Sequence, residues 1–183
     1  GNVIGGDHYG ERNVISNNGQ RGVGIQDDET ERNAVFGNYI GTNVDGTGPL
    51  GNDAEGVLIF NGARLNQVGG SQAAQRNVIG GNAGTGVAIW NSGTASNTVA
   101  GNYIGLDVSG AQSLGNHSTG VNLGGGANHN QLGGAMPGEG NVISTNGDHG
   151  VTVWEPGTEY NVIAGNYIGT DASGTAGKGN YND

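Results

Sequence analysis

The stretch NVIAGNYIGTDASG at residues 161–174 decides the fold, because two close variants of it occur earlier in the chain. NAVFGNYIGTNVDG occupies residues 33–46, and NTVAGNYIGLDVSG occupies residues 97–110. The three starts lie 64 residues apart each time, without insertion or deletion. A fixed period of this kind predicts a repeat architecture rather than an ordinary globular domain.

The repeat organises the whole chain, residues 1–183, as a single segment of three copies at 2–65, 66–129 and 130–183, the last one incomplete. Each copy holds two half-units, and each half-unit carries two Asn-x-aliphatic triplets followed by Gly-Val-x-aliphatic. Three short strand-like runs in about 30 residues are typical of a solenoid. The pattern predicts an all-β fold: a right-handed, single-stranded parallel β-helix (β-solenoid) of about six coils and three parallel sheets.

Strand alternation predicts which side chains fill the interior. Residues two apart in a strand share a face, so the aliphatic third residue of each triplet points inward and the variable middle residue points outward. The predicted inward residues of the first two sheets are Ile4, Ile15, Val35, Ile40, Val68, Ile79, Val99, Ile104, Leu132, Ile143, Ile163 and Ile168. In the third sheet, both aliphatic residues of Gly-Val-x-aliphatic point inward.

The asparagine that opens each triplet recurs without exception. Because coils stack about 4.8 Å apart, these residues form columns, and an amide can donate to one neighbour while accepting from the other. We therefore predict two asparagine ladders. The first contains Asn2, Asn33, Asn66, Asn97, Asn130 and Asn161, and the second contains Asn13, Asn38, Asn77, Asn102, Asn141 and Asn166.

Composition and charge restrict the class of protein. The chain has 41 glycines, no cysteine, and 16 acidic against six basic side chains, for a formal net charge of −10. Negative charge disfavours nucleic acid as a partner, and no apolar run is long enough to cross a membrane. The chain begins without Met or a leader sequence, so we expect a piece of a longer protein.

Long loops follow the tyrosine strands and carry Asn43, Asp107 and Asp171 at matched positions. A calcium site needs several converging oxygens, whereas one acidic or amide side chain recurs in each loop. The sequence favours a turn-capping role for these residues. We expect no cofactor and no metal ion, with calcium at the long loops as the weaker alternative.

Outward aromatic residues are the candidate ligand or assembly surface. Tyr39, Tyr103 and Tyr167 share one column, which the long loops could cover. Phe60, Trp90 and Trp154 share another. Two tryptophan rings about 9.6 Å apart, twice the coil spacing, could stack on the sugars of an extended polysaccharide. They could equally contact another chain or a loop.

No catalytic residue is predicted. Asp27, Asp28 and Glu29 form one acidic turn, and Asp148–His149 is the most plausible acid–base pair. The four histidines, His8, His117, His129 and His149, occupy non-equivalent positions. A single active site requires one part of the repeat to differ in a concerted way, and no part of the sequence does so.

The coil pattern resembles the right-handed parallel β-helix superfamily, the pectate-lyase-like fold, over essentially the whole chain. The run NVISNNG…GVGI…NAVFGNYIGTNVDG…LGN…GVLI more narrowly resembles the PbH1-type repeat arrays of large bacterial surface and secreted proteins. Because many members of the superfamily act on acidic polysaccharides, the resemblance implies a polysaccharide lyase, hydrolase or epimerase as the alternative to a structural role.

The sequence thus favours a structural protein: a rigid spacer, stalk or fibre segment of a longer extracellular or cell-surface protein from a bacterium or archaeon. Its expected partners are further repeats of the same chain or other copies of it. A polysaccharide is the other expected partner, and a carbohydrate-binding adhesin is a further alternative function.

Overall fold

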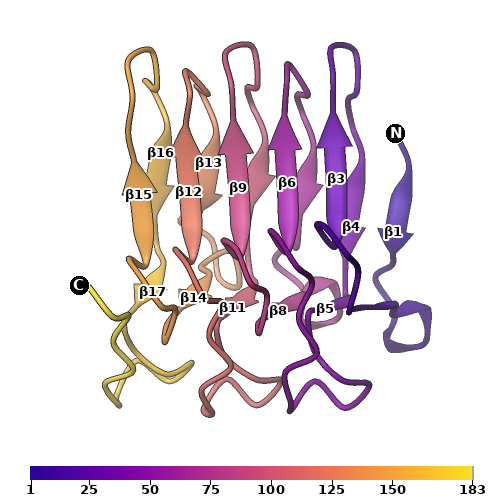
Figure 1. Cartoon of the computed structure of the whole chain (residues 1–183), viewed down its shortest axis with the longest axis vertical. Coiled ribbons are helices and arrows are strands. Elements are labelled where there is room, and N and C mark those ends of the chain that lie inside the picture. The colour runs from indigo at the N-terminus through magenta and orange to yellow at the C-terminus, as the bar shows by residue number, and fades with distance from the viewer. Residues whose placement is uncertain (183) are drawn as a thin grey trace.

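The computed structural model describes residues 1–182 and shows a β-solenoid of three parallel sheets, with five complete coils and the first two strands of a sixth. In Figure 1 the coils follow one another from the N-terminus to the C-terminus. Sheet A contains β1 (Val3–Gly5), β4 (Ala34–Phe36), β7 (Gln67–Val68), β10 (Thr98–Val99), β13 (Gln131–Gly133) and β16 (Val162–Ala164).

The other two sheets complete each coil. Sheet B contains β2 (Val14–Ile15), β5 (Tyr39–Ile40), β8 (Val78–Ile79), β11 (Tyr103–Ile104), β14 (Val142–Ile143) and β17 (Tyr167–Ile168). Sheet C contains β3 (Val23–Gln26), β6 (Val57–Phe60), β9 (Val87–Trp90), β12 (Val121–Gly124) and β15 (Val151–Val153). Two 3₁₀ turns, η1 (Tyr9–Glu11) and η2 (Ala73–Gln75), are the only helical elements among the described residues.

The strands pair in the register that the repeat predicts, so identical positions lie side by side in successive coils. Ile104, for example, pairs with Ile79 on one side and with Ile143 on the other. The predicted inward residues of sheets A and B are buried in coils two to five, and those of sheet C are buried in coils one to four. Toward the ends they are less covered: Ile4, Ile15 and Val151 are partly buried, and Val153, Ile163 and Ile168 are exposed. Burial of this continuous aliphatic column is the main stabilising term of the fold.

Both predicted asparagine ladders are present. In each, the backbone N–H and the side-chain Nδ2–H of one asparagine donate to Oδ1 of the asparagine in the next coil. Asn102, which is fully buried, donates to Asn141 Oδ1 through both groups at 3.0 Å. Asn102 Nδ2 also donates to Val68 O, at 2.9 Å. Every polar group of the amide is thereby paired, as a buried position requires.

A third asparagine ladder, which the sequence analysis did not predict, lies at the corner of the coil that precedes each strand of sheet C. Its members are Asn18, Asn52, Asn82, Asn116, Asn146 and Asn180, and each donates to the next in the same two-bond pattern. The signal was available, because the spacing Asn-x-x-x-Gly-Val is constant before the third strand of every complete coil. Each corner of the coil therefore has its own column of amides.

Every second coil has a long loop at the same corner, and these loops project from one edge of the solenoid (Figure 1). They contact one another across the intervening coil: Val108 N–H donates to Gly46 O at 3.0 Å, and Ala172 N–H donates to Gly110 O at 2.9 Å. The loops thus add a layer to the solenoid. Over residues 1–182, no helix has the length and apolar character needed to span a membrane.

Candidate functional site

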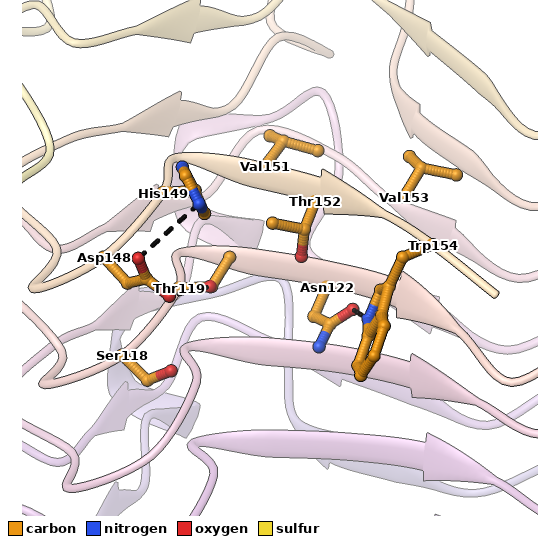
Figure 2. Close-up of a pocket in the computed structure, with 9 residues that line it drawn as sticks. All are labelled: Ser118, Thr119, Asn122, Asp148, His149, Val151, Thr152, Val153 and Trp154. Carbon is orange, nitrogen blue, oxygen red and sulfur yellow. Dashed lines mark hydrogen bonds and ion pairs between the residues drawn. The ribbon is translucent and has the colours of Figure 1, made fainter. Parts of the chain in front are cut away.

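A hollow lies on the outer face of sheet C, where β12 and β15 end the series of complete coils. It has a volume of about 550 Å³, and Figure 2 shows that polar side chains line one end and Trp154 the other. Its lining residues are Ser118, Thr119, Asn122, Asp148, His149, Val151, Thr152, Val153 and Trp154. A smaller hollow, which shares Asn122 and reaches Trp90 and Glu55, continues it toward the N-terminal coils.

The polar end of the hollow consists mainly of residues in the turns that connect the third ladder to β12 and β15. Asp148 Oδ1 lies 3.6 Å from His149 Nε2, and Thr119 Oγ1 lies 3.5 Å from Asp148 Oδ2. Asn182 Nδ2 also donates to Asp148 Oδ1, at 2.6 Å. Asp148 and His149, which the sequence offered as the most plausible acid–base pair, thus line a hollow. Asp148 is the one carboxylate in the lining, whereas glycoside hydrolysis uses two.

The aromatic end differs from the prediction of two rings about 9.6 Å apart. Trp90 and Trp154 contact each other, with ring centroids 5.2 Å apart and planes inclined by 56°. The reason is Gly124, which pairs with Trp90 in the register and occupies the coil between the two tryptophans. A Cβ at Gly124 would lie 2.1 Å from Trp90 Cζ3, so the missing side chain lets the indole lean across the coil.

The two tryptophans have different surroundings. Trp154 is half exposed and donates its Nε1–H to Asn122 Oδ1 at 2.9 Å. Phe60, which pairs with Trp90 in the register, lies beneath the Arg21 guanidinium at 5.1 Å. The predicted aromatic stripe is therefore one tilted tryptophan pair, adjoining a phenylalanine that an arginine covers.

The tyrosine column of sheet B is covered to different degrees along its length. Tyr39 is buried, Tyr103 is partly buried and Tyr167 is half exposed. The long loops cover the first two: a Cβ at Gly46 would lie 2.8 Å from the Tyr39 ring, and one at Gly110 would lie 2.9 Å from the Tyr103 ring.

Arginines from the preceding coils cover the same two tyrosines. The Cζ atom of Arg12 lies 4.1 Å from the Tyr39 centroid, and that of Arg76 lies 4.2 Å from the Tyr103 centroid. Both arginines directly precede a ladder asparagine, and the third copy has Gly140 at that place. The sequence interpretation missed these contacts, although the matched positions of Arg12 and Arg76 were a usable signal.

The acidic and amide residues of the long loops cap their own turns. Asp107 Oδ1 accepts hydrogen bonds from Ser109 Oγ at 2.6 Å and from Gln112 N–H at 3.0 Å. Asn43 Oδ1 accepts the corresponding backbone N–H of Gly48 at 3.2 Å. Burial raises the pKa of Asp107, but the hydrogen bonds outweigh it and hold the pKa below its ordinary value of 3.8. Hydrogen bonding by Ser173 likewise lowers the pKa of Asp171.

The other ionisable residues that the sequence analysis considered lie apart from the hollow on sheet C. Asp7, His8 and Glu11 bring their ligand atoms within 4.8 Å of one another on an exposed turn, where Glu11 also accepts the backbone N–H of His8 at 3.2 Å. The predicted acidic turn at residues 27–29 joins β3 to sheet A. His129 stacks on Tyr160, with ring centroids 5.0 Å apart. None of these groups lines the hollow on sheet C.

Comparison of the chain with protein-family models, with curated proteins and with solved structures gives no match. The resemblance to pectate-lyase-like proteins and to PbH1-type arrays therefore rests on the coil pattern. What the structure shows is a β-solenoid of three parallel sheets stabilised by asparagine ladders.

Proposed function

We propose that this chain is a structural segment: a rigid spacer or fibre unit of an extracellular or cell-surface protein, whose coils add to further coils at its ends. The observation that carries the proposal is the common direction of the three ladders. In each of them, the donors of one coil face the acceptors of the next from the first coil to the last.

The two end surfaces are complementary as a result. At the first coil, no described residue donates to the Oδ1 atoms of Asn2, Asn13 and Asn18. At the last coil, no described residue accepts the backbone N–H groups of Asn161 and Asn166. Acceptors at one end and donors at the other fit a head-to-tail neighbour in the same register.

Apolar surface accompanies these polar groups. Ile163 and Ile168 are 41% and 42% exposed in the last coil, whereas their counterparts Leu132 and Ile143 are 1% and 0% exposed one coil earlier. Burying the end surfaces against another coil removes this apolar area from water and pairs the open strand edges. The added coil can come from a longer chain or from a second copy.

The test is self-association in solution. Sedimentation velocity over a range of concentrations should show that the wild-type chain forms head-to-tail oligomers. Ile163→Lys, which places a charge on the end surface, should abolish them while circular dichroism stays unchanged. Val44→Lys is the matched control, because Val44 is 72% exposed on a loop. A wild-type chain that stays monomeric, or oligomers that survive Ile163→Lys, would contradict end-to-end addition of a second copy.

Enzyme activity is the competing function. Incubation with pectate, alginate and polygalacturonate, with and without Ca²⁺, should release neither unsaturated products nor reducing ends. Reproducible turnover that is lost in an Asp148→Asn variant would replace the structural proposal with a catalytic one centred on the sheet C hollow.

Carbohydrate binding is a second candidate function, favoured by the half-exposed Trp154 beside Asn122. An indole face next to an amide can stack on a sugar ring and bond its hydroxyls. Glycan-array binding should then be lost in Trp154→Ala and retained in Tyr181→Ala, whose side chain is 83% exposed elsewhere. Binding that is equal in both variants, or absent in the wild type, would exclude this function.

A further inference from the structure

The surroundings of the sheet B tyrosine differ among the three copies of the repeat: the first two place an arginine over the ring, and the third has no arginine at that position. In the first copy, Arg12 lies over Tyr39 and its Nε–H donates to Gly37 O at 3.1 Å. In the second copy, Arg76 lies over Tyr103 and donates to Gly101 O at 3.1 Å. An aromatic face and a glycine carbonyl thus form a receptor for a guanidinium group, and the chain fills it twice with its own arginine.

The third copy has the receptor without the arginine. Tyr167 and Gly165 stand where Tyr103 and Gly101 stand, but Gly140 replaces the arginine. A hollow of about 420 Å³ lies at this place, and its lining includes Tyr167, Gly165, Gly140, Met136 and Pro137. Among residues 1–182, no donor is paired with Gly165 O.

The chain's own residue 140 is not positioned to fill this hollow. A Cβ at Gly140 would lie 2.1 Å from Gly165 O, so a side chain would require the backbone to move. A side chain at position 140 is therefore excluded as the group that fills this hollow. Tyr167 and Met136 are accessible, since they are 50% and 66% exposed.

We propose that this hollow binds the guanidinium group of an arginine side chain presented by a partner polypeptide. The two filled copies show the geometry: the guanidinium lies over the tyrosine ring while an N–H donates to the glycine carbonyl. Met136 and Pro137 provide an apolar wall for the methylene stem of the arginine. The net charge of −10 attracts a cation to the surface.

One arginine lines the hollow, and two carboxylates belong to residues next to its lining. Arg76 forms the far wall, where its guanidinium is already held over Tyr103. Glu139 and Asp171 adjoin lining residues, and both carboxylates accept backbone hydrogen bonds within their own turns. A planar guanidinium fits this arrangement better than an ammonium group, because it stacks on a ring and donates sideways at the same time.

The proposal is tested by titrating Nα-acetyl-arginine methylamide into protein with ¹³C-labelled tyrosine rings and recording NMR spectra. The Tyr167 resonances should shift and saturate, and those of Tyr39, which does not line the hollow, should not. The matching lysine and citrulline compounds should bind at least about fivefold more weakly, and Tyr167→Leu should weaken arginine binding about tenfold. Tyr181→Leu, an exposed tyrosine elsewhere, should leave binding unchanged.

A second variant uses the repeat itself as the control. Arg12→Ala uncovers the Tyr39 receptor, so the variant should bind a second equivalent of the arginine compound, seen as a new saturable shift of Tyr39. The absence of a Tyr167 shift in the wild type, or equal binding of the citrulline compound, would overturn the proposal. If Arg12→Ala does not fold by circular dichroism, Tyr167→Leu decides the question alone.

Discussion

At the scale of single residues, the ladder asparagines carry the tightest constraint in the molecule. Asn77, inside the stack, accepts two hydrogen bonds from Asn38 on Oδ1 and donates three, two to Asn102 and one to Val35. Oδ1 and Nδ2 lie on one planar group, so no other side chain of this size supplies the same set. This explains why asparagine recurs where other positions vary.

The first prediction is that Asn102→Leu destabilises the protein by about 1–3 kcal/mol, because the N–H groups of buried Asn77 lose their acceptor. Urea unfolding followed by circular dichroism measures the change. Gln112→Leu, on the exposed part of a loop, is the control and should have little effect. Equal stability of Asn102→Leu and the wild type would show that the ladder bonds contribute nothing net.

The second prediction concerns a corner glycine. Gly101 has a φ of 69°, and a Cβ there would lie 2.1 Å from Gly70 O. Gly101→Ala should therefore lower stability by about 2 kcal/mol or more, through left-handed backbone strain and the steric overlap. Gly177→Ala, whose added Cβ would meet nothing within 4 Å, should be nearly neutral. Thermal unfolding compares the two, and a neutral Gly101→Ala would contradict this account of the corner.

At the scale of elements, the long loops behave as parts of the fold rather than as free connections. Each is closed by its capping Asn or Asp and lies against a tyrosine of sheet B, more tightly in coils two and four than in coil six. Successive long loops also bond to each other across the intervening coil. A loop with this many fixed backbone bonds has little freedom left, which fits a stiffening role better than that of a mobile binding loop.

The third prediction is a change in acid sensitivity at one loop. The folded-state pKa of Asp107 is below its ordinary value of 3.8, so the stabilisation is fully present above pH 3.8 and is lost as the pH falls through the folded-state pKa. Asp107→Asn keeps the acceptor, as Asn43 does naturally, and removes the titration. Melting temperatures from pH 7 to pH 2 should therefore fall less steeply in Asp107→Asn. Parallel curves would contradict the assignment.

At the scale of the whole molecule, stability is distributed along one axis. Each coil pairs its strands only with the coils before and after it, whereas the long loops and the Trp90–Trp154 pair reach two coils away. The interior coils have both neighbours and the end coils have one, which is why the exposed core residues are concentrated at the ends. Stability should then rise with the number of coils.

The fourth prediction follows from this modularity. A second copy of residues 66–129 inserted after His129 keeps the register, so it should add two coils and lengthen the solenoid by about 10 Å. Small-angle X-ray scattering should show that increase, and the melting temperature should rise because two more interior coils are present. An insertion of residues 66–112, which breaks the repeat inside a loop, is the control and should destabilise. An unfolded or unchanged product of the full insertion would contradict nearest-neighbour stacking.

The amino-acid sequence by itself determined the coil, the inward positions and two of the ladders. These properties depend on strand alternation and on stacking of each residue against its own counterpart, and both repeat identically along the chain. The third ladder was equally determined by its constant spacing from Gly-Val, although the prediction missed it. The corner glycines follow the same logic, as the positive φ of Gly101 shows.

Only the tertiary structure decided how side chains lean from one coil to another. Trp90 reaches Trp154 because Gly124 leaves space between them, and the Tyr167 corner is open because Gly140 stands where Arg12 and Arg76 stand in the other copies. Such contacts depend on rotamers and on which neighbour lacks a side chain. A repeat pattern specifies which residues are adjacent, whereas the direction of a long side chain on the outer face depends on the space that its neighbours leave.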